Sequence, residues 1–189
     1  SCIVLSHFKG HSMGGYGGAL KQLSIGFASQ AGKTWIHTAG NITEWELMDF
    51  FEANQANFTA SMADAASTIV QYFRNRGGIA FINVLANISL ECDCAGGDAP
   101  KPRIHDMGIF ASLDPVAIDR ACLDMIAEHQ DIGTEDFFGQ LNNLTGENTI
   151  YVAENHKIGS QQYNLINIDI EEGEENNNLL LIIVLSLVA

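Results

Sequence analysis

Hydrophobic residues follow two periods along this chain, one typical of strands and one typical of helices. The run from Cys2 to Phe8 is apolar and rich in β-branched residues, which predicts a buried strand. A second run, from Ile79 to Leu90, clusters Ile, Phe, Val and Leu as a central strand does. Between them, apolar residues recur at helical spacing over Ala19–Ser29 and again from Phe58 to Phe73.

The second half of the chain continues this alternation. A short strand over 109–113 is followed by Asp114 and Pro115, a helix start with aspartate as N-cap and proline at the first position. The other expected elements are helices near 44–54, 115–128, 134–141 and 148–156 and a strand over 163–168. The pattern predicts an α/β fold over residues 1–170, a single compact domain whose mixed or mainly parallel sheet is flanked by helices.

Residues 171–189 have a different composition. Glu171 to Asn178 is acidic and polar, as in a linker, whereas Leu179 to Ala189 is apolar except for Ser186. A segment of eleven residues is too short to cross a bilayer. We therefore expect no membrane span, and a terminal strand that packs back on the domain.

Charge is distributed unevenly over the sequence. The formal net charge is −14, which argues against nucleic acid as a partner because phosphates would be repelled. The first 43 residues nevertheless contain Lys9, Lys21 and Lys33 and no carboxylate, so they carry +3 while the remainder carries −17. Such asymmetry predicts a local site for a small anionic ligand or cofactor within an acidic protein.

Glycines and histidines surround these lysines. Glycine loops before a helix expose backbone N–H groups to anions, and imidazoles can transfer protons or bind metals. We therefore predict His11 and Lys21 as catalytic, His37 as a metal ligand, and a set of cofactor-binding residues: Lys9, Gly17, Gly18, Lys21 and Lys33. The alternative is that the glycines only form a tight turn and the histidines are ordinary loop residues.

A pair of cysteines follows the predicted central strand. Cys92 and Cys94 would point the same way from an extended chain, so both sulfurs could reach one metal ion or iron–sulfur cluster. Two thiols alone do not complete a four-coordinate site, and a redox-inert pair is the alternative. Four cysteines are too few for a disulfide scaffold, which favours a reducing, cytoplasmic location. Of the acids, Asp114 has a sufficient explanation as a cap, and Asp119 is a secondary candidate for the same cleft.

Several of these motifs, in this order, resemble the family called domain of unknown function 362. They are His7-Phe8-Lys9-Gly10-His11, Gly17-Gly18-Ala19-Leu20-Lys21, Ala31-Gly32-Lys33, Cys92-Asp93-Cys94 and the segment from Ser112 to Asp119. The resemblance extends over about residues 4–169 and implies an iron–sulfur association. The chain lacks the ferredoxin-like C-x2-C-x2-C run, so only Cys92 and Cys94 could serve as ligands.

The spacing of His11, Gly15, Gly18, Lys21 and His37 is also similar to a region of nickel-dependent lactate racemase. That resemblance implies an acid/base role for His11, a covalent tether for a nickel pincer nucleotide at Lys21 and nickel ligation by His37. Together, these patterns predict redox or isomerase chemistry on a small anionic molecule. The competing hypotheses are a non-enzymatic anion- or nucleotide-binding module, or one part of a larger redox protein with a protein partner.

Overall fold

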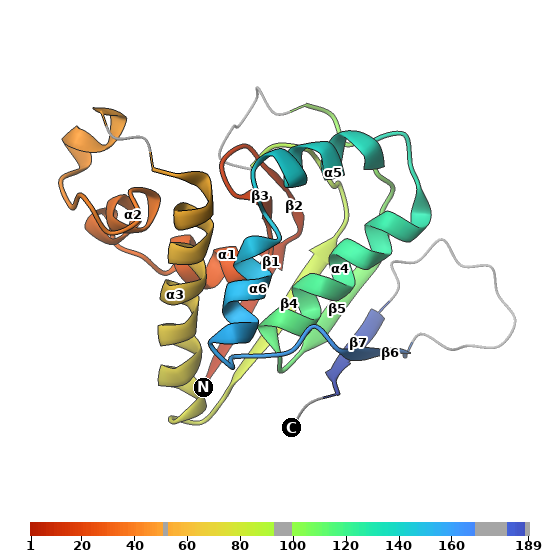
Figure 1. Cartoon of the computed structure of the whole chain (residues 1–189). Coiled ribbons are helices and arrows are strands. Elements are labelled where there is room, and N and C mark those ends of the chain that lie inside the picture. Colours follow the sequence, from red (N-terminus) through yellow and green to blue (C-terminus); the bar gives the residue numbers. More distant parts are fainter. Residues whose placement is uncertain (51–52, 93–99, 169–180, 188–189) are drawn as a thin grey trace, which may run out of the picture.

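The computed structural model describes residues 1–50, 53–92, 100–168 and 181–187 (Figure 1). Its strands are β1 (Cys2–His7), β2 (Lys9–His11), β3 (Gly15–Gly17), β4 (Ile79–Leu85), β5 (Gly108–Ser112), β6 (Tyr163–Asn167) and β7 (Leu181–Ser186). Its α-helices are α1 (Ala19–Lys21), α2 (Gln30–His37), α3 (Gln55–Arg74), α4 (Pro115–His129), α5 (Thr134–Asn143) and α6 (Asn148–Asn155). A π-helical segment, η1 (Gln22–Gly26), continues α1, and a 3-10 helix, η2, covers Trp45–Phe50.

Five strands form one mixed sheet in the order β1-β4-β5-β7-β6. Strands β1 and β4 run parallel, as do β5 and β7, whereas β4–β5 and β6–β7 are antiparallel pairs. The short strands β2 and β3 form a separate hairpin beyond the end of β1. The predicted fold class, an α/β domain with a mixed sheet and flanking helices, is confirmed.

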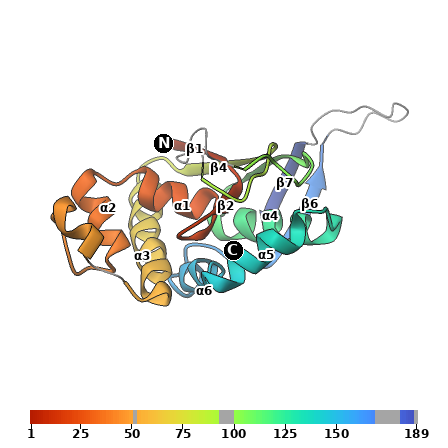
Figure 2. The same ribbon diagram turned by 90° about the horizontal axis from the view of Figure 1, so that it is seen from above.

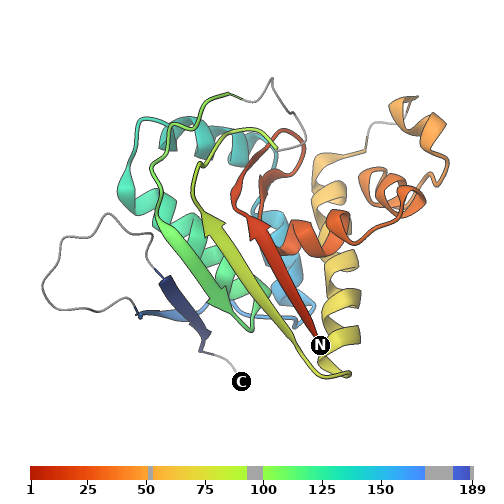
Figure 3. The same cartoon turned by 180° about the vertical axis from the view of Figure 1, so that it is seen from behind.

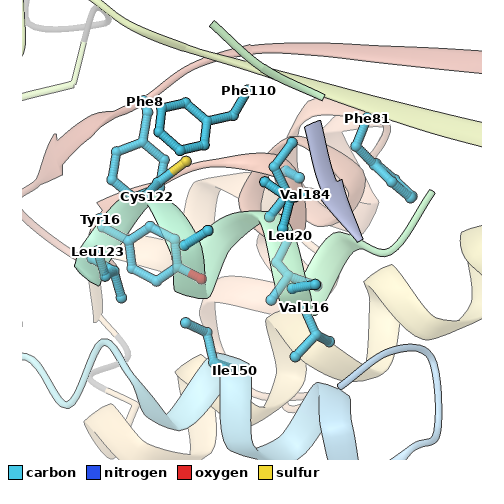
Figure 4. Close-up of a cluster of buried hydrophobic side chains, with 14 of the residues drawn as sticks. Phe8, Tyr16, Leu20, Phe81, Phe110, Val116, Cys122, Leu123, Ile150 and Val184 are labelled. Atoms are coloured by element: carbon cyan, nitrogen blue, oxygen red, sulfur yellow. The ribbon is translucent and has the colours of Figure 1, made fainter. Parts of the chain in front are cut away.

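The helices lie on one side of the sheet, as the view from above shows (Figure 2). The core fills the space between that side and helices α1, α3, α4 and α6 (Figure 4). Phe81 and Phe110 enter it from the sheet and Leu123 from α4, and all three are fully buried. Tyr16, from β3, places its side chain and hydroxyl in the same core, so it packs the β2–β3 hairpin against the rest of the domain.

The local signals that start and end elements account for several of these boundaries. Asp114 accepts hydrogen bonds from the amides of Val116 and Ala117 at 2.8 and 2.9 Å, which confirms it as the N-cap of α4. Its other oxygen accepts from the amide of Ser160 at 2.9 Å, so the cap also ties down the chain after α6. The terminal strand that we expected is β7.

Other boundaries differ from the sequence prediction. The helix expected over Ala19–Ser29 ends at Gly26, and Ser29 caps a further helix, α2, which the pattern had not shown. Helix α2 is only eight residues long, and its N-cap lies inside the run that the pattern assigned to the preceding helix. Strand β4 stops at Leu85, before a turn in which Asn87 has a φ of 53°. The helix expected over 44–54 is the shorter η2. None of the helices in the described ranges is long and apolar enough to cross a membrane.

Candidate functional site

The hairpin β2–β3 lies against the segment that follows β4, and this contact assembles the site. The Gly10 amide donates to the Ser89 carbonyl at 2.8 Å. A Cβ on Gly10 would stand 2.3 Å from the Leu90 carbonyl oxygen, so no larger residue fits between the two backbones. This close approach brings Cys92 to the residues of the hairpin and of α1.

A buried carboxylate, Asp119, accepts hydrogen bonds from the first backbone amides of α1. Asp119, on α4, accepts from the amides of Ala19 and Leu20 at 2.8 and 2.9 Å. It also accepts from the Tyr16 hydroxyl at 3.1 Å and the Asn83 side-chain amide at 2.8 Å. These four bonds join the glycine loop, α1, β4 and α4 at one point.

Burial raises the pKa of Asp119 to about 6, against the four hydrogen bonds that favour its ionised form. The same burial, together with the adjacent carboxylate, holds the pKa of Tyr16 well above its usual range. Gly18 is required beside this group, because a Cβ there would lie 2.5 Å from the Asp119 Oδ1. Asp119 thus positions the loop and does not face the cleft as a reactive acid.

The side chains of two lysines, Lys9 and Lys21, meet beside Gly17. A Cβ placed on Gly17 would lie 3.6 Å from Cε of Lys9 and 3.8 Å from Cδ of Lys21, so both side chains run over this residue. Lys9 itself is buried, although it belongs to a two-stranded hairpin. The Lys21 ammonium lies 3.9 Å from the Cys92 sulfur, which places one of the predicted thiols at the same site.

His11 lies among these cations and is 7% exposed. Its Nδ1 accepts hydrogen bonds from the amides of Met13 and Gly14, both at 3.1 Å. Because an amide can only donate, Nδ1 has no proton, and the single proton of the neutral ring is on Nε2. Burial, followed by the charges of Lys21, His37 and Lys9, lowers the pKa of His11 to about 4. The ring is therefore neutral at pH 7, with its tautomer set by the turn.

His37 approaches the same site from α2 in the opposite tautomer. Its Nδ1 donates to the Lys33 carbonyl at 2.8 Å, which leaves the lone pair on Nε2. The ring stacks on Phe58, with 5.1 Å between centroids, and burial lowers its pKa. The charges of Lys21 and Lys33 lower it further, so Lys33 also lies within electrostatic reach. We call Lys9, His11, Lys21 and His37 the Lys/His cluster.

Of the three predicted metal ligands, the structure describes His37 and Cys92. Cys94 lies outside the described residues. Within the described ranges, no three His, Cys, Asp or Glu side chains are grouped so that they could hold a metal ion. The described residues therefore do not make up the ligand set of an iron–sulfur cluster, and we derive no chemical step through one.

Sequence reasoning missed the residues that support the site. Asn83 is a fully buried amide in a strand that is otherwise almost entirely apolar, and Tyr16 is an aromatic residue inside a glycine run. Such polar groups in apolar or glycine-rich surroundings were the available signal. Sequence reasoning also missed a cavity of about 640 Å³ at the opposite end of the sheet, lined by Arg74, Asp114, Glu154, Lys157, Gly159, Ser160 and Gln162.

Comparison with known families adds to this geometry. The family described as "Domain of unknown function (DUF362)" matches residues 1–124, about two thirds of the chain. The chain belongs to the DUF362 family. The matched region runs from β1 into α4 and contains the whole Lys/His cluster, Cys92 and the Asp119 anchor. Searches of curated proteins and of solved structures gave no match, so the DUF362 assignment rests on the family comparison alone.

Proposed function

We propose that the Lys/His cluster binds a small anionic molecule and that His11 exchanges a proton with it. The state of His11 carries this proposal: a neutral imidazole, with its proton on Nε2, is held among two lysines and a second histidine. Among the described residues, the groups that shift the pKa of His11 or His37 are lysines, the other histidine and a backbone carbonyl. A bound anion would add negative charge beside these cations and so favour the protonated form of both rings.

The chemistry follows from the same electrostatics. A bound carboxylate or phosphate would offset the charges of Lys9 and Lys21 and so raise the pKa of His11 toward neutrality. An acid/base group works best when its pKa is near the operating pH. The ring would take up a proton at Nδ1, in place of its hydrogen bonds from the Met13 and Gly14 amides, and would release one from Nε2 to the substrate. The Lys21 ammonium would stabilise negative charge that develops on the substrate. Isomerisation or redox chemistry on a small anionic molecule fits this arrangement.

A second candidate is a site that holds a metal-containing cofactor. The observation that favours it is the lone pair on His37 Nε2, because a histidine that donates from Nδ1 to a carbonyl is prepared to ligate through its other nitrogen. In this version Lys21 would tether the cofactor, which is the role that the nickel-pincer resemblance implies. The cofactor would supply the redox chemistry, and His11 would keep its acid/base role.

Thermal-shift titration tests the proposed function. We expect inorganic phosphate, pyrophosphate and small carboxylates to raise the melting temperature, and Lys21→Met to abolish that rise. Lys157→Met is the matched control, because this lysine is exposed at the opposite end of the sheet and should leave the rise unchanged. Equal responses from the two variants would refute an anion site at the cluster.

Two further measurements separate the versions. If the protein only binds anions, Lys21→Met will weaken binding while His11→Asn leaves it intact and no proton exchange at bound substrate is found. If a cofactor is tethered, intact-mass analysis of protein from cells that make such cofactors will show an adduct that is lost in Lys21→Met. An unmodified mass would refute the tethered version and leave the anion site untouched.

A further inference from the structure

One face of the sheet is not covered by any helix that the structure describes. The view from behind shows strands β1, β4, β5 and β7 in front, with the helices on the far side (Figure 3). The register identifies the side chains on this face, because pairs alternate between the two sides. We call it the open face; it comprises Ile3, Leu5, His7, Ala80, Ile82, Val84, Ile109, Ala111, Asn164, Ile166, Leu181, Ile183 and Leu185.

The open face is apolar across its full width. One row of paired residues crosses all five strands, and every member is apolar: Leu5, Ile82, Ala111, Ile183 and Ile166. On the edge strand β1, Ile3 is 70% exposed and Leu5 63%, whereas the members of the row on the inner strands are half-buried by their neighbours within the sheet. The polar exceptions, His7 and Asn164, lie on the two edge strands. A sheet face that is exposed to water normally carries polar residues, so an apolar face of this kind marks an interaction site.

The size of the open face can be compared with what a stable interface needs. Five strands about 4.8 Å apart, each with about six residues rising about 3.3 Å, span an area on the order of 480 Å². Two such faces in contact would together bury on the order of 1,000 Å², which is about the minimum for a biological interface and is typical of weak complexes. The area suits a dimer of modest affinity.

The chemistry of the open face favours a copy of itself as the partner. The face carries no lysine, arginine or carboxylate that would select a partner of opposite charge. A two-fold axis brings identical surfaces together, which suits a uniform apolar patch. A net charge of −14 disfavours the anionic surface of a membrane.

We propose that the open face is the interface of a homodimer, in which two sheets pack face to face about 10 Å apart. This inference is independent of the proposed function, because the Lys/His cluster lies beyond the strand ends and does not belong to this face. The dimer would be a four-layer arrangement, with helices outside and two sheets inside.

Sedimentation velocity of the whole chain, from about 1 to 300 µM, tests the proposal. We expect a concentration-dependent monomer–dimer equilibrium and at least a tenfold weaker association for Ile3→Glu. Ile132→Glu is the matched control: Ile132 is 78% exposed, follows α4 and lies outside the open face. It introduces the same charge and should dimerise like the wild type.

Three results would overturn the proposal. A wild-type protein that stays monomeric at 300 µM has no such dimer. Equal weakening by Ile3→Glu and Ile132→Glu would assign the effect to added charge and not to the face. Monomeric protein that binds phosphatidylcholine vesicles through Ile3 would assign the face to lipid. Leu5→Glu repeats the test at a second exposed position of the central row, should Ile3→Glu fail to fold.

Discussion

Replacing His11 by asparagine should remove a specific part of the pH dependence of stability. Asparagine can keep an oxygen near the position of Nδ1, where it would accept from the Met13 and Gly14 amides, but it does not titrate. In the wild type, folding lowers the pKa of His11 from 6.5 to about 4. The folded state therefore binds fewer protons than the unfolded state across this range.

The sign and size follow from linkage. A depressed pKa makes a contribution to the free energy of unfolding that is fully present above pH 6.5 and is lost as the pH falls toward 4. A shift of this size corresponds to about 3 kcal/mol. Asp119 contributes with the opposite sign, because its pKa is raised to about 6 and its contribution is lost as the pH rises through that value. The wild-type profile alone can therefore look flat.

Urea unfolding at pH 4, 5, 6 and 7 of wild type and His11→Asn separates the two groups. We expect the wild type to lose about 3 kcal/mol more than the variant between pH 7 and pH 4. His156→Asn is the control, since His156 is an exposed residue paired with Asp64 and far along the chain. A difference that stays constant with pH would refute the neutral, buried state of His11.

Two further predictions concern the support of the site. The destabilisation caused by Asp119→Asn should be largest near pH 4 and about 3 kcal/mol smaller at pH 7, because only the wild type then bears the cost of a buried charge; urea unfolding would measure it. Gly18→Ala should lower stability by about 1–3 kcal/mol through its clash with Asp119. In Gly17→Ala the new methyl group makes only ordinary contacts, so the variant should keep the wild-type melting temperature but be stabilised less by phosphate. Equal destabilisation by the two alanine substitutions would contradict this account.

The sequence was informative about the fold wherever the cause of an element is local. The apolar period of α3 and the Asp-Pro start of α4 are complete within a few residues, so both were predicted. Helix α2 has only eight residues and follows directly on the preceding helical run, so its start at Ser29 was not recognised. Strand β4 is shortened by a turn whose geometry no apolar pattern encodes. The open face follows from where the helices pack, which a pattern of buried strands could not reveal.

The clustering of the candidate residues also has a largely local cause. Lys9, His11 and Lys21 lie within the β2–β3 hairpin and the helix that follows it, so residues close in sequence bring them together. The anchoring role of Asp119 depends on α4 passing beneath α1, a contact between residues 100 positions apart. Sequence reasoning had placed this carboxylate in the cleft only as a secondary candidate, and the structure places it in the core.

Nitrogen-15 NMR of the His11 side chain, with and without phosphate, tests the central claim most directly. We predict a neutral ring at pH 7 with its proton on Nε2, and a pKa near 4 that rises clearly when phosphate is added. The Asp64-paired His156 serves as the internal reference, and its nitrogen signals should not change when phosphate is added. A His11 ring protonated on Nδ1, or a pKa that phosphate leaves unchanged, would contradict the anion site that we propose.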